Sequence, residues 1–415
     1  MKDGVEGRLG AALDTLFDLH DPRGDGPVAI AISGGGDSTA LLLAAQDWSK
    51  RHGRAILAAT VDHGLRPASV DEADHVARMC RSRGIPHETL RLNGLHDGPN
   101  LQARARAARY DALSDWAIRV RCDVVLLGHT ADDAAETLIL RLRRGAGIDG
   151  LARMSEWFGD RPAFARPFLD VPRAMLHEML SARGVTPLQD PSNDDRRFDR
   201  VAVRQAIAEL SLDIGNLTKS AERLREARQS LERRACDIAA AIAREDRGDL
   251  LLDWRALSDL IDREREQARR ILLGALRWVG GDAYPPRGSE LMTLLQSVRQ
   301  GRDGTLAGCL FRHEGDRLRI ARELAAAGPP CATDALWDGR WRVAGPGGPG
   351  LSVGALGHDI RHTPWRNSGL PRASVMASPS IRGKEGELIA APLAGMPAGW
   401  SAEPCVPFTQ VLIDR

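Results

Sequence analysis

Apolar runs of strand length alternate with stretches of helical periodicity between residues 28 and 143. Four such runs predict strands, at 28–33, 55–62, 88–92 and 123–128. Apolar residues recur every three or four positions between and after them, which predicts helices at 38–50, 70–83, 102–119 and 131–143. Strands that alternate with helices usually pair in parallel, and the resulting sheet lies between two layers of helices. We therefore expect an α/β domain with a doubly wound parallel sheet.

The pattern changes beyond residue 191, where long charged helices replace the alternation. A smaller unit at 248–323 ends in a segment typical of a β-hairpin, and the chain is rich in Gly and Pro from about residue 325. We predict three parts: the α/β domain, a helical domain, and a Gly/Pro-rich linker with a small α+β or β-rich domain, at 1–210, 211–324 and 325–415.

Length and charge narrow the class of protein. A chain of 415 residues exceeds the roughly 250–300 residues at which a single core stops growing, so several domains are expected. Lys and Arg number 57 against 56 Asp and Glu, a net charge of +1, so no field of the whole protein attracts nucleic acid, and any polyanion site must be local.

The sequence shows no pattern typical of a membrane span, a signal peptide, or cysteines paired for disulfides or metal binding. No apolar run is long enough to span a bilayer, and the first residues carry charges where a signal peptide is apolar, which predicts a cytoplasmic protein with no membrane partner. The six cysteines are scattered without a C-x-x-C pair, so neither a disulfide framework nor a zinc or iron–sulfur site is expected.

A glycine-rich loop joins the first expected strand to its helix. The loop consists of Ser33, Gly34, Gly35, Gly36, Asp37 and Ser38. Glycines can turn several N–H groups toward one anion, and the N-terminus of the helix adds positive charge, so the loop predicts a phosphate site at the carboxyl edge of the sheet. The lysine of the usual P-loop is missing, and a carboxylate at Asp37 beside phosphate is useful chiefly where Mg²⁺ lies between them. A simple turn with Asp37 and Ser38 as a helix cap is the alternative.

This loop resembles the S-G-G-x-D-S motif of the N-type ATP pyrophosphatases. Members of that superfamily cleave ATP to AMP and pyrophosphate while they activate an oxygen of the substrate as its adenylate. The resemblance implies a nucleotide-binding domain, ATP and Mg²⁺ as cofactors, pyrophosphate contacts from residues 33–38, and Asp37 as the metal ligand and a catalytic residue. It says little about the substrate.

Five further segments narrow the substrate. They read TVDHGLRPAS, NLQARARAARY, LGHTADDAAETLILRLRRGAGIDGLARM, RPFLDVPRAMLHEML and DPSNDDRRFDRVAVR, at 60–69, 100–110, 127–154, 166–180 and 190–204. Their order and identity are similar to the bacterial tRNA(Ile)-lysidine synthetases, strongly over about 25–205 and weakly to about 325. The resemblance implies that ATP adenylates the C2 oxygen of the wobble cytidine in the CAU anticodon of tRNA(Ile). The ε-amine of free L-lysine then displaces AMP to give lysidine. Whether the protein forms a homodimer stays open.

Basic residues in these segments are expected at the nucleotide. His63 and Arg66 follow the second strand and are placed to meet ATP, with a surface turn as the alternative. Arg106 and Arg109 are three residues apart on one helix face, so both can reach the same phosphates unless the face is merely solvated.

Carboxylates begin the helix after the fourth strand. Asp133 and Glu136 are three residues apart and share a face. Such a pair suits lysine, whose ammonium must be bound and then lose a proton before the amine attacks. Asp132 is expected to contact metal or cytidine, and His129 is equally a structural or a catalytic imidazole. Capping of the helix N-terminus is the alternative for the carboxylates.

The helical domain at 211–324 is expected to contact tRNA through the basic side chains of its long helix, with a merely solvated helix as the alternative. The resemblance also implies further substrate contacts. These residues are Arg141, Arg144, Asp190, Asn193, Arg200 and Arg204. For the last two, a salt-bridge network at a helix start is the alternative. The chain departs from the family pattern at three positions, where a second histidine, a glutamine and an asparagine are usual. The residues present there are Thr130, Ala134 and Val201.

Other functions share parts of this pattern. A tRNA 2-thiolation enzyme would use paired or catalytic cysteines near the sheet, and Cys80 and Cys122 offer no such pair. A GMP- or NAD-synthetase-like amidation would share the loop but not the other segments. An RNA-binding protein with a retired ATP site is disfavoured by the intact loop and by the carboxylates at Asp133 and Glu136.

Overall fold

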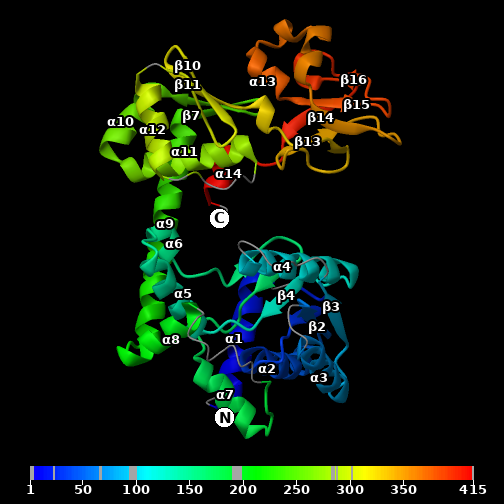
Figure 1. The fold of residues 1–415 in the computed structure, drawn as a ribbon, viewed down its shortest axis with the longest axis vertical. Helices are drawn as coiled ribbons and strands as arrows, with labels where there is room; N and C mark the ends of the chain where they lie inside the picture. The colour runs from blue at the N-terminus through cyan, green and yellow to red at the C-terminus, as the bar shows by residue number, and fades with distance from the viewer. Residues whose placement is uncertain are drawn as a thin grey trace. The chain divides into compact units, whose positions relative to one another are not determined.

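The computed structural model describes residues 4–21, 24–64, 68–92, 101–188, 199–281, 286, 288–300 and 302–413. The chain divides into two compact units, Met1–Arg228 and Gln229–Arg415, and the boundary falls within one long helix, α9 (Ile214–Ile242) (Figure 1). The domain boundaries expected at 210 and 324 stay predictions.

A six-stranded sheet forms the centre of the first unit, with the strand order β3-β2-β1-β4-β6-β5. The strands are β1 (Val28–Ala31), β2 (Ile56–Asp62), β3 (His87–Arg91), β4 (Val124–Leu127), β5 (Trp157–Phe158) and β6 (Ala163–Ala165). All neighbours pair in parallel except β5 and β6. The predicted doubly wound sheet and its first four strands are therefore confirmed.

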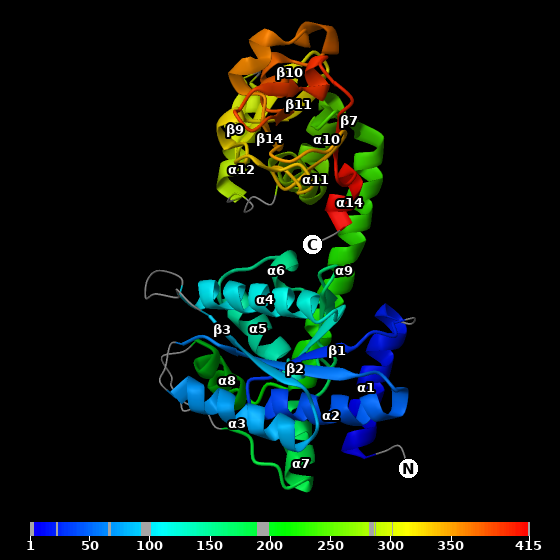
Figure 2. The same ribbon diagram turned by 90° about the vertical axis from the view of Figure 1, so that its right-hand side faces the viewer.

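Both faces of this sheet are buried. Val28 and Ile30 contribute to one core and Ala29 and Ala31 to another, which is why β1 reads as an unbroken apolar run. Figure 2 shows α4 on one side of the sheet and α2 and α3 on the other. The helices of this unit are α1 (Val5–His20), α2 (Gly36–His52), α3 (Ala68–Ser82), α4 (Leu101–Arg119), α5 (Ala131–Arg143), α6 (Ile148–Leu151), α7 (Arg173–Ala182) and α8 (Asp199–Glu209).

The second unit contains a five-stranded antiparallel sheet, ordered β7-β8-β11-β10-β9. Its strands are β7 (Ala243–Asp246), β8 (Asp249–Asp253), β9 (Gly304–Leu306), β10 (Cys309–Glu314) and β11 (Arg317–Arg322). Three helices accompany it, α10 (Trp254–Arg263), α11 (Arg265–Gly280) and α12 (Gly288–Arg299). The predicted hairpin is confirmed as β10–β11, and the segment expected to be helical also contains this sheet.

The Gly/Pro-rich region is built from short elements. A four-stranded sheet, ordered β12-β14-β15-β16, lies beside a two-stranded pair, β13-β17. The strands are β12 (Cys331–Ala332), β13 (Trp341–Ala344), β14 (Ser352–Ala355), β15 (Pro379–Arg382), β16 (Leu388–Ala390) and β17 (Ser401–Pro404). The helices are η2 (Leu324–Ala326), η3 (Gly357–His362), η4 (Trp365–Ser368), α13 (Arg372–Met376), η5 (Pro392–Ala394) and α14 (Phe408–Ile413). This confirms a strand-rich C-terminal region.

The last helix, α14, returns to the core of the five-stranded sheet. Phe408 and Leu412 are buried in the same cluster as α11, and a Cβ at Gly274 would collide with Leu412. The indole N–H of Trp278 donates to the Val406 carbonyl at 2.9 Å. Residues more than 120 positions apart in the sequence therefore complete one core.

Arg340 and Asp249 join the C-terminal region to the same sheet. The guanidinium of Arg340 is buried 5.1 Å from the ring centroids of both Trp278 and Trp341, and it donates to the carbonyls of Val279 and Gly248. The carboxylate of Asp249 accepts hydrogen bonds from Ser374 at 2.6 Å and from Arg319 at 2.8 Å.

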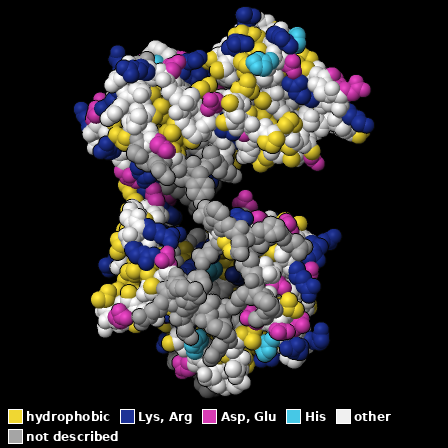
Figure 3. All heavy atoms as spheres, in the orientation of Figure 1, with side chains coloured by type: hydrophobic (Ala, Val, Ile, Leu, Met, Phe, Trp, Pro, Cys, Tyr) yellow, Lys and Arg dark blue, Asp and Glu magenta, His cyan; other side chains and the backbone are white. Residues whose placement is uncertain are grey.

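The surface shows charges of both signs. On the face in Figure 3, Lys and Arg are interspersed with Asp and Glu, as the net charge of +1 suggests. No helix in the described part of the chain is long and apolar enough to cross a membrane.

Candidate active site

The glycine-rich loop turns tightly between β1 and α2. Gly34 has a φ of +85°, and a Cβ there would lie 2.6 Å from a Leu188 methyl, so conformation and space both require glycine. The hydroxyl of Ser38 accepts from the Ser33 N–H at 3.1 Å and donates to the Gly35 carbonyl at 3.1 Å, which fixes the turn. Gly35 precedes α2 without capping it by a side chain, so the first N–H groups of the helix remain suited to an anion.

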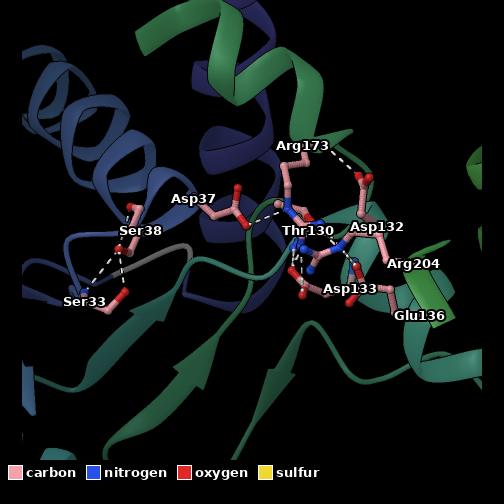
Figure 4. Close-up of polar contacts among 10 residues, drawn as sticks. Ser33, Asp37, Ser38, Thr130, Asp132, Asp133, Glu136, Arg173 and Arg204 are labelled. Carbon is pink, nitrogen blue, oxygen red and sulfur yellow. Dashed lines mark hydrogen bonds and ion pairs between the residues drawn. The ribbon is translucent and has the colours of Figure 1, made fainter. Parts of the chain in front are cut away.

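Three carboxylates meet one guanidinium beside this loop (Figure 4). The side chain of Arg173, at the start of α7, donates to Asp37 at 2.9 Å, to Asp133 at 3.2 Å and to Glu136 at 3.2 Å. Its backbone N–H donates to Asp132 at 2.7 Å. The glycine-rich loop and the carboxylates of α5, predicted separately, therefore meet at one place.

Thr130 and Asp133 form a capping box at the start of α5. The backbone N–H and hydroxyl of Thr130 donate to Asp133 Oδ2 at 2.9 and 3.0 Å, and the Asp133 N–H donates back to the hydroxyl at 3.4 Å. Thr130 is fully buried. The hydroxyl at this departure from the family pattern thus orients one of the predicted lysine-binding carboxylates.

Burial and pairing act in opposite directions on the ionisable groups. Burial raises the pKa of Asp37, although Arg173 opposes the effect. At Asp133 the guanidinium of Arg173 and the N–H of Thr130 together outweigh burial, so the pKa is lowered. Burial lowers the pKa of Arg173, but the carboxylates of Asp133 and Asp37 raise it by more. The net shift is upward, so this guanidinium stays charged.

Two buried carboxylate oxygens are left over. Asp37 Oδ1 and Glu136 Oε2 find no hydrogen-bond partner among the described residues. An unpaired buried carboxylate oxygen is costly unless a cation or donor arrives. A loop carboxylate with a free oxygen beside a phosphate cradle fits a Mg²⁺ ion, since Mg²⁺ prefers oxygen ligands from one or two carboxylates and from phosphate.

A positively charged region adjoins the carboxylates. Burial, followed by the charge of Arg166, lowers the pKa of His129 to about 3, and Arg106 and Arg109 add to the effect. Arg109 also lowers the pKa of His63, after burial. His129 is therefore neutral, and these basic residues share one region that suits an anion.

The other predicted residues have different surroundings. Arg204 donates to Glu136 at 2.9 Å and so joins the carboxylates, and the charge of Arg200 lowers the pKa of Asp133. Arg141 donates to the Gly150 carbonyl at 2.7 Å, and Arg144 pairs with an exposed Asp199 at 3.1 Å. Their substrate contacts stay predictions. Three predicted residues lie outside the described part of the chain: Arg66, Asp190 and Asn193.

Sequence reasoning missed Arg173 and His177. They are four residues apart and both approach the loop from α7, with His177 Nε2 only 2.9 Å from where a Cβ of Gly36 would lie. The available signal was an arginine directly after Pro172, at a helix start, with a histidine on the same face. The segment at 166–180, which contains both residues, is one of those that resemble the family, but neither residue was assigned a role.

Comparisons with known proteins show which proteins this chain is similar to. Residues 11–211 match the model of the PP-loop domain family. A tRNA(Ile)-lysidine synthase of Ruegeria pomeroyi is 42% identical over 400 residues, covering 94% of this chain and 93% of the relative. One from Novosphingobium aromaticivorans is 39% identical, covering 74% of this chain and 92% of the relative.

Among solved structures, the U34-tRNA thiolase NcsA from Methanococcus maripaludis, with its [4Fe-4S] cluster, matches with a TM-score of 0.46 at 17% identity. The match covers 54% of this chain and 79% of that one. A likeness this distant says nothing about the reaction.

Proposed function

Because the chain belongs to the tRNA(Ile)-lysidine synthase family, we propose that it joins free L-lysine to C2 of the wobble cytidine in the CAU anticodon of tRNA(Ile). ATP is consumed to AMP and pyrophosphate. The observation within the molecule that supports this best is the meeting of Asp37, Asp133 and Glu136 at Arg173. One end of this group faces the phosphate loop, and the other is a carboxylate pair of the kind that binds an ammonium.

The loop would hold the triphosphate of ATP. The backbone of the loop glycines and the first turn of α2 would supply N–H groups for the β- and γ-phosphates. Asp37, with its unpartnered Oδ1, would hold Mg²⁺, which supplies neutralisation of the negative charge on the leaving pyrophosphate. His63, Arg106 and Arg109 would face the nucleotide or the tRNA phosphates.

In the first step the C2 oxygen of the cytidine attacks the α-phosphorus in line. The bond from that phosphorus to the bridging oxygen breaks, and pyrophosphate leaves. Holding both reactants in this geometry, with N–H groups aimed at the departing charge, is the main contribution that the protein can make.

In the second step lysine replaces AMP. Asp133 and Glu136 bind the ε-ammonium, and a carboxylate accepts the proton that the amine must lose. The nitrogen then bonds to C2, and the bond from C2 to the oxygen of AMP breaks. The lowered pKa of Asp133 favours its ionised form, which is the form that binds an ammonium.

A thiolation reaction receives no support from the cysteines. Burial raises the pKa of Cys80 and of Cys122 to about 11, so both thiols are poor nucleophiles near neutral pH. Among the described residues, no group of three or more His, Cys, Asp and Glu side chains could hold a metal ion, as a thiolation enzyme that depends on an iron–sulfur cluster would require.

The test measures pyrophosphate release and lysine incorporation with a CAU-anticodon tRNA(Ile) transcript. A tRNA(Met) transcript serves as the control. Both signals should appear only with the isoleucine tRNA, and Asp37→Ala should abolish both. Pyrophosphate release without lysine incorporation would refute the lysine step while leaving the adenylation step intact.

Asp133→Asn separates the two steps. Asparagine keeps an acceptor oxygen for the Thr130 cap but loses the charge that binds and deprotonates lysine. We expect kcat/KM for lysine to fall about 100-fold, while a single turnover without lysine still releases pyrophosphate. Glu178→Gln, which removes an exposed carboxylate from α7, should behave as wild type. An equal loss of both steps in Asp133→Asn would contradict this role.

ATP, free lysine and tRNA occur together in the cytoplasm, where we expect the protein to act. A homodimer is a further expectation, and sedimentation of the purified protein tests it.

A further inference from the structure

The carboxylate pair assigned to lysine is already occupied by a cation of the protein itself. Both oxygens of Asp133 have partners, because Oδ2 accepts from Thr130 at 2.9 Å and Oδ1 accepts from Arg173 at 3.2 Å. Glu136 Oε1 accepts from Arg173 at 3.2 Å and from Arg204 at 2.9 Å. Only Glu136 Oε2 lacks a partner among the described residues.

A lysine ammonium that approaches this pair therefore finds three of the four carboxylate oxygens already hydrogen-bonded. The guanidinium of Arg173 has the same charge as the substrate group and donates to the same two carboxylates. A second cation on these oxygens would lie against the first, and like charges a few ångströms apart repel strongly in a buried site. Lysine and Arg173 thus compete for one place.

Arg173 cannot leave this place without another anion. Its guanidinium is largely buried, and a buried charge that loses its partners is costly. The third bond of the guanidinium, to Asp37 at 2.9 Å, already points toward the loop expected to hold the triphosphate. Phosphate oxygens accept the planar, multidentate donors of arginine as well as carboxylates do.

We propose that Arg173 occupies the lysine site in the free protein and that the triphosphate of ATP draws its guanidinium away, so that lysine binds only after the nucleotide. This inference rests on the proposed function. It makes Arg173 a positioning residue that orders the two substrates through the carboxylates it releases. By linkage, bound lysine should tighten binding of the nucleotide by the same factor.

The experiment measures the Kd of lysine with the full-length protein by isothermal titration calorimetry. Titrations are run with Mg²⁺ throughout, with and without α,β-methylene ATP, which cannot release pyrophosphate. If the occupied state is at least nine-tenths populated, the analogue should lower the apparent Kd of lysine about tenfold or more in the wild type. In Arg173→Gln the Kd without nucleotide should already be low, and the analogue should change it little.

Arg183→Gln is the matched control. This change removes the same charge from the other end of α7, where Arg183 pairs with Glu6 and Asp47 rather than with the site. It should keep the wild-type response to the analogue. Arg173→Lys keeps the charge but loses the planar group that donates to three carboxylates at once. The effect of the analogue on the Kd of lysine should therefore lie between those of wild type and Arg173→Gln.

Two results would overturn the inference. If Arg173→Gln, or Arg173→Lys should the first variant not fold, binds lysine more weakly than wild type without nucleotide, then Arg173 arranges the carboxylates for lysine rather than blocking them. If the wild-type Kd is the same with and without the analogue, no exchange occurs. Failure of the proposed function looks different, because wild type would then incorporate no lysine even with ATP and tRNA(Ile).

Discussion

At the scale of single residues, the site is a balance of charges held out of water. Asp37, Asp133 and Glu136 share Arg173, and each contact lowers the free energy of a buried ion that would be costly alone. In the basic region beside them, positive charges are not matched in this way. Burial and the neighbouring arginines lower the pKa of His129 and keep its imidazole neutral. The two regions thus offer one place for a cation and another for an anion.

The neutral state of His129 predicts how stability depends on pH. Its folded pKa of about 3 lies below the value of about 6.5 that it has in the unfolded chain. The unfolded chain therefore takes up the proton first as pH falls. The contribution of His129 to stability is complete above pH 6.5 and is lost progressively toward pH 3.

His129→Gln removes this dependence. Between pH 7 and pH 5 the wild type should lose about 2 kcal/mol more unfolding free energy than the variant, as measured by urea denaturation at both pH values. Parallel losses in wild type and His129→Gln would show that folding does not lower the pKa of this imidazole.

The role of Arg173 could not have been predicted from local sequence. The predicted loop, Asp133 and Glu136 follow from spacing within one or two turns of chain, which determines local geometry. Arg173 lies 136 residues from Asp37 and 40 from Asp133, so its contacts depend on where α7 packs. No pattern within α7 reports that packing.

At the scale of elements, regular segments were predictable in proportion to their length. The strands β1, β2 and β4 are apolar throughout or nearly so, and α2 to α5 repeat their apolar face over several turns, so the pattern alone locates them. The strand β3, with the sequence HETLR, is mostly polar and was located by the strands and helices on either side of it. In contrast β5, β6 and β12 have two or three residues each, too few to show a period. They form because neighbouring strands offer unpaired backbone groups.

The start of α5 shows how an element positions chemistry. Thr130→Ala should lower the unfolding free energy of the Met1–Arg228 unit by about 1 kcal/mol, because it removes the cap and one donor to Asp133. Urea denaturation measures the change, and Thr130→Ser should restore most of it. Thr137→Ala is the control, since the Thr137 hydroxyl has no hydrogen-bond partner among the described residues. A larger loss in Thr137→Ala would argue against the cap.

At the scale of the whole molecule, the C-terminal region is part of the second unit rather than an appendage. Arg340, Ser374 and Phe408 each contact residues of the five-stranded sheet or its helices. A truncation at residue 325 would remove these partners and expose the core around α11. Loss of tRNA binding in such a truncation would therefore not locate a tRNA contact in the missing part.

Phe408→Ala measures this dependence. Removing the ring leaves a cavity beside Trp278 and should lower the unfolding free energy of the Gln229–Arg415 unit by about 3 kcal/mol, without affecting the transition of the Met1–Arg228 unit. Differential scanning calorimetry would resolve both transitions. Val406→Ala, at a partly exposed position nearby, should change neither by more than about 0.5 kcal/mol. An unchanged Phe408→Ala protein would show that α14 contributes nothing to this core.

The return of α14 to α11 also has a consequence for synthesis on the ribosome. The six-stranded sheet needs only residues made early, so the first unit can fold while translation continues. The core of the second unit waits for Phe408 and Leu412, although α11 is complete by Gly280. Until then the part of α11 that α14 covers is exposed, even after α10 and the five-stranded sheet have packed on the rest of the helix. Nascent chains halted between these points therefore expose apolar surface that a chaperone would bind.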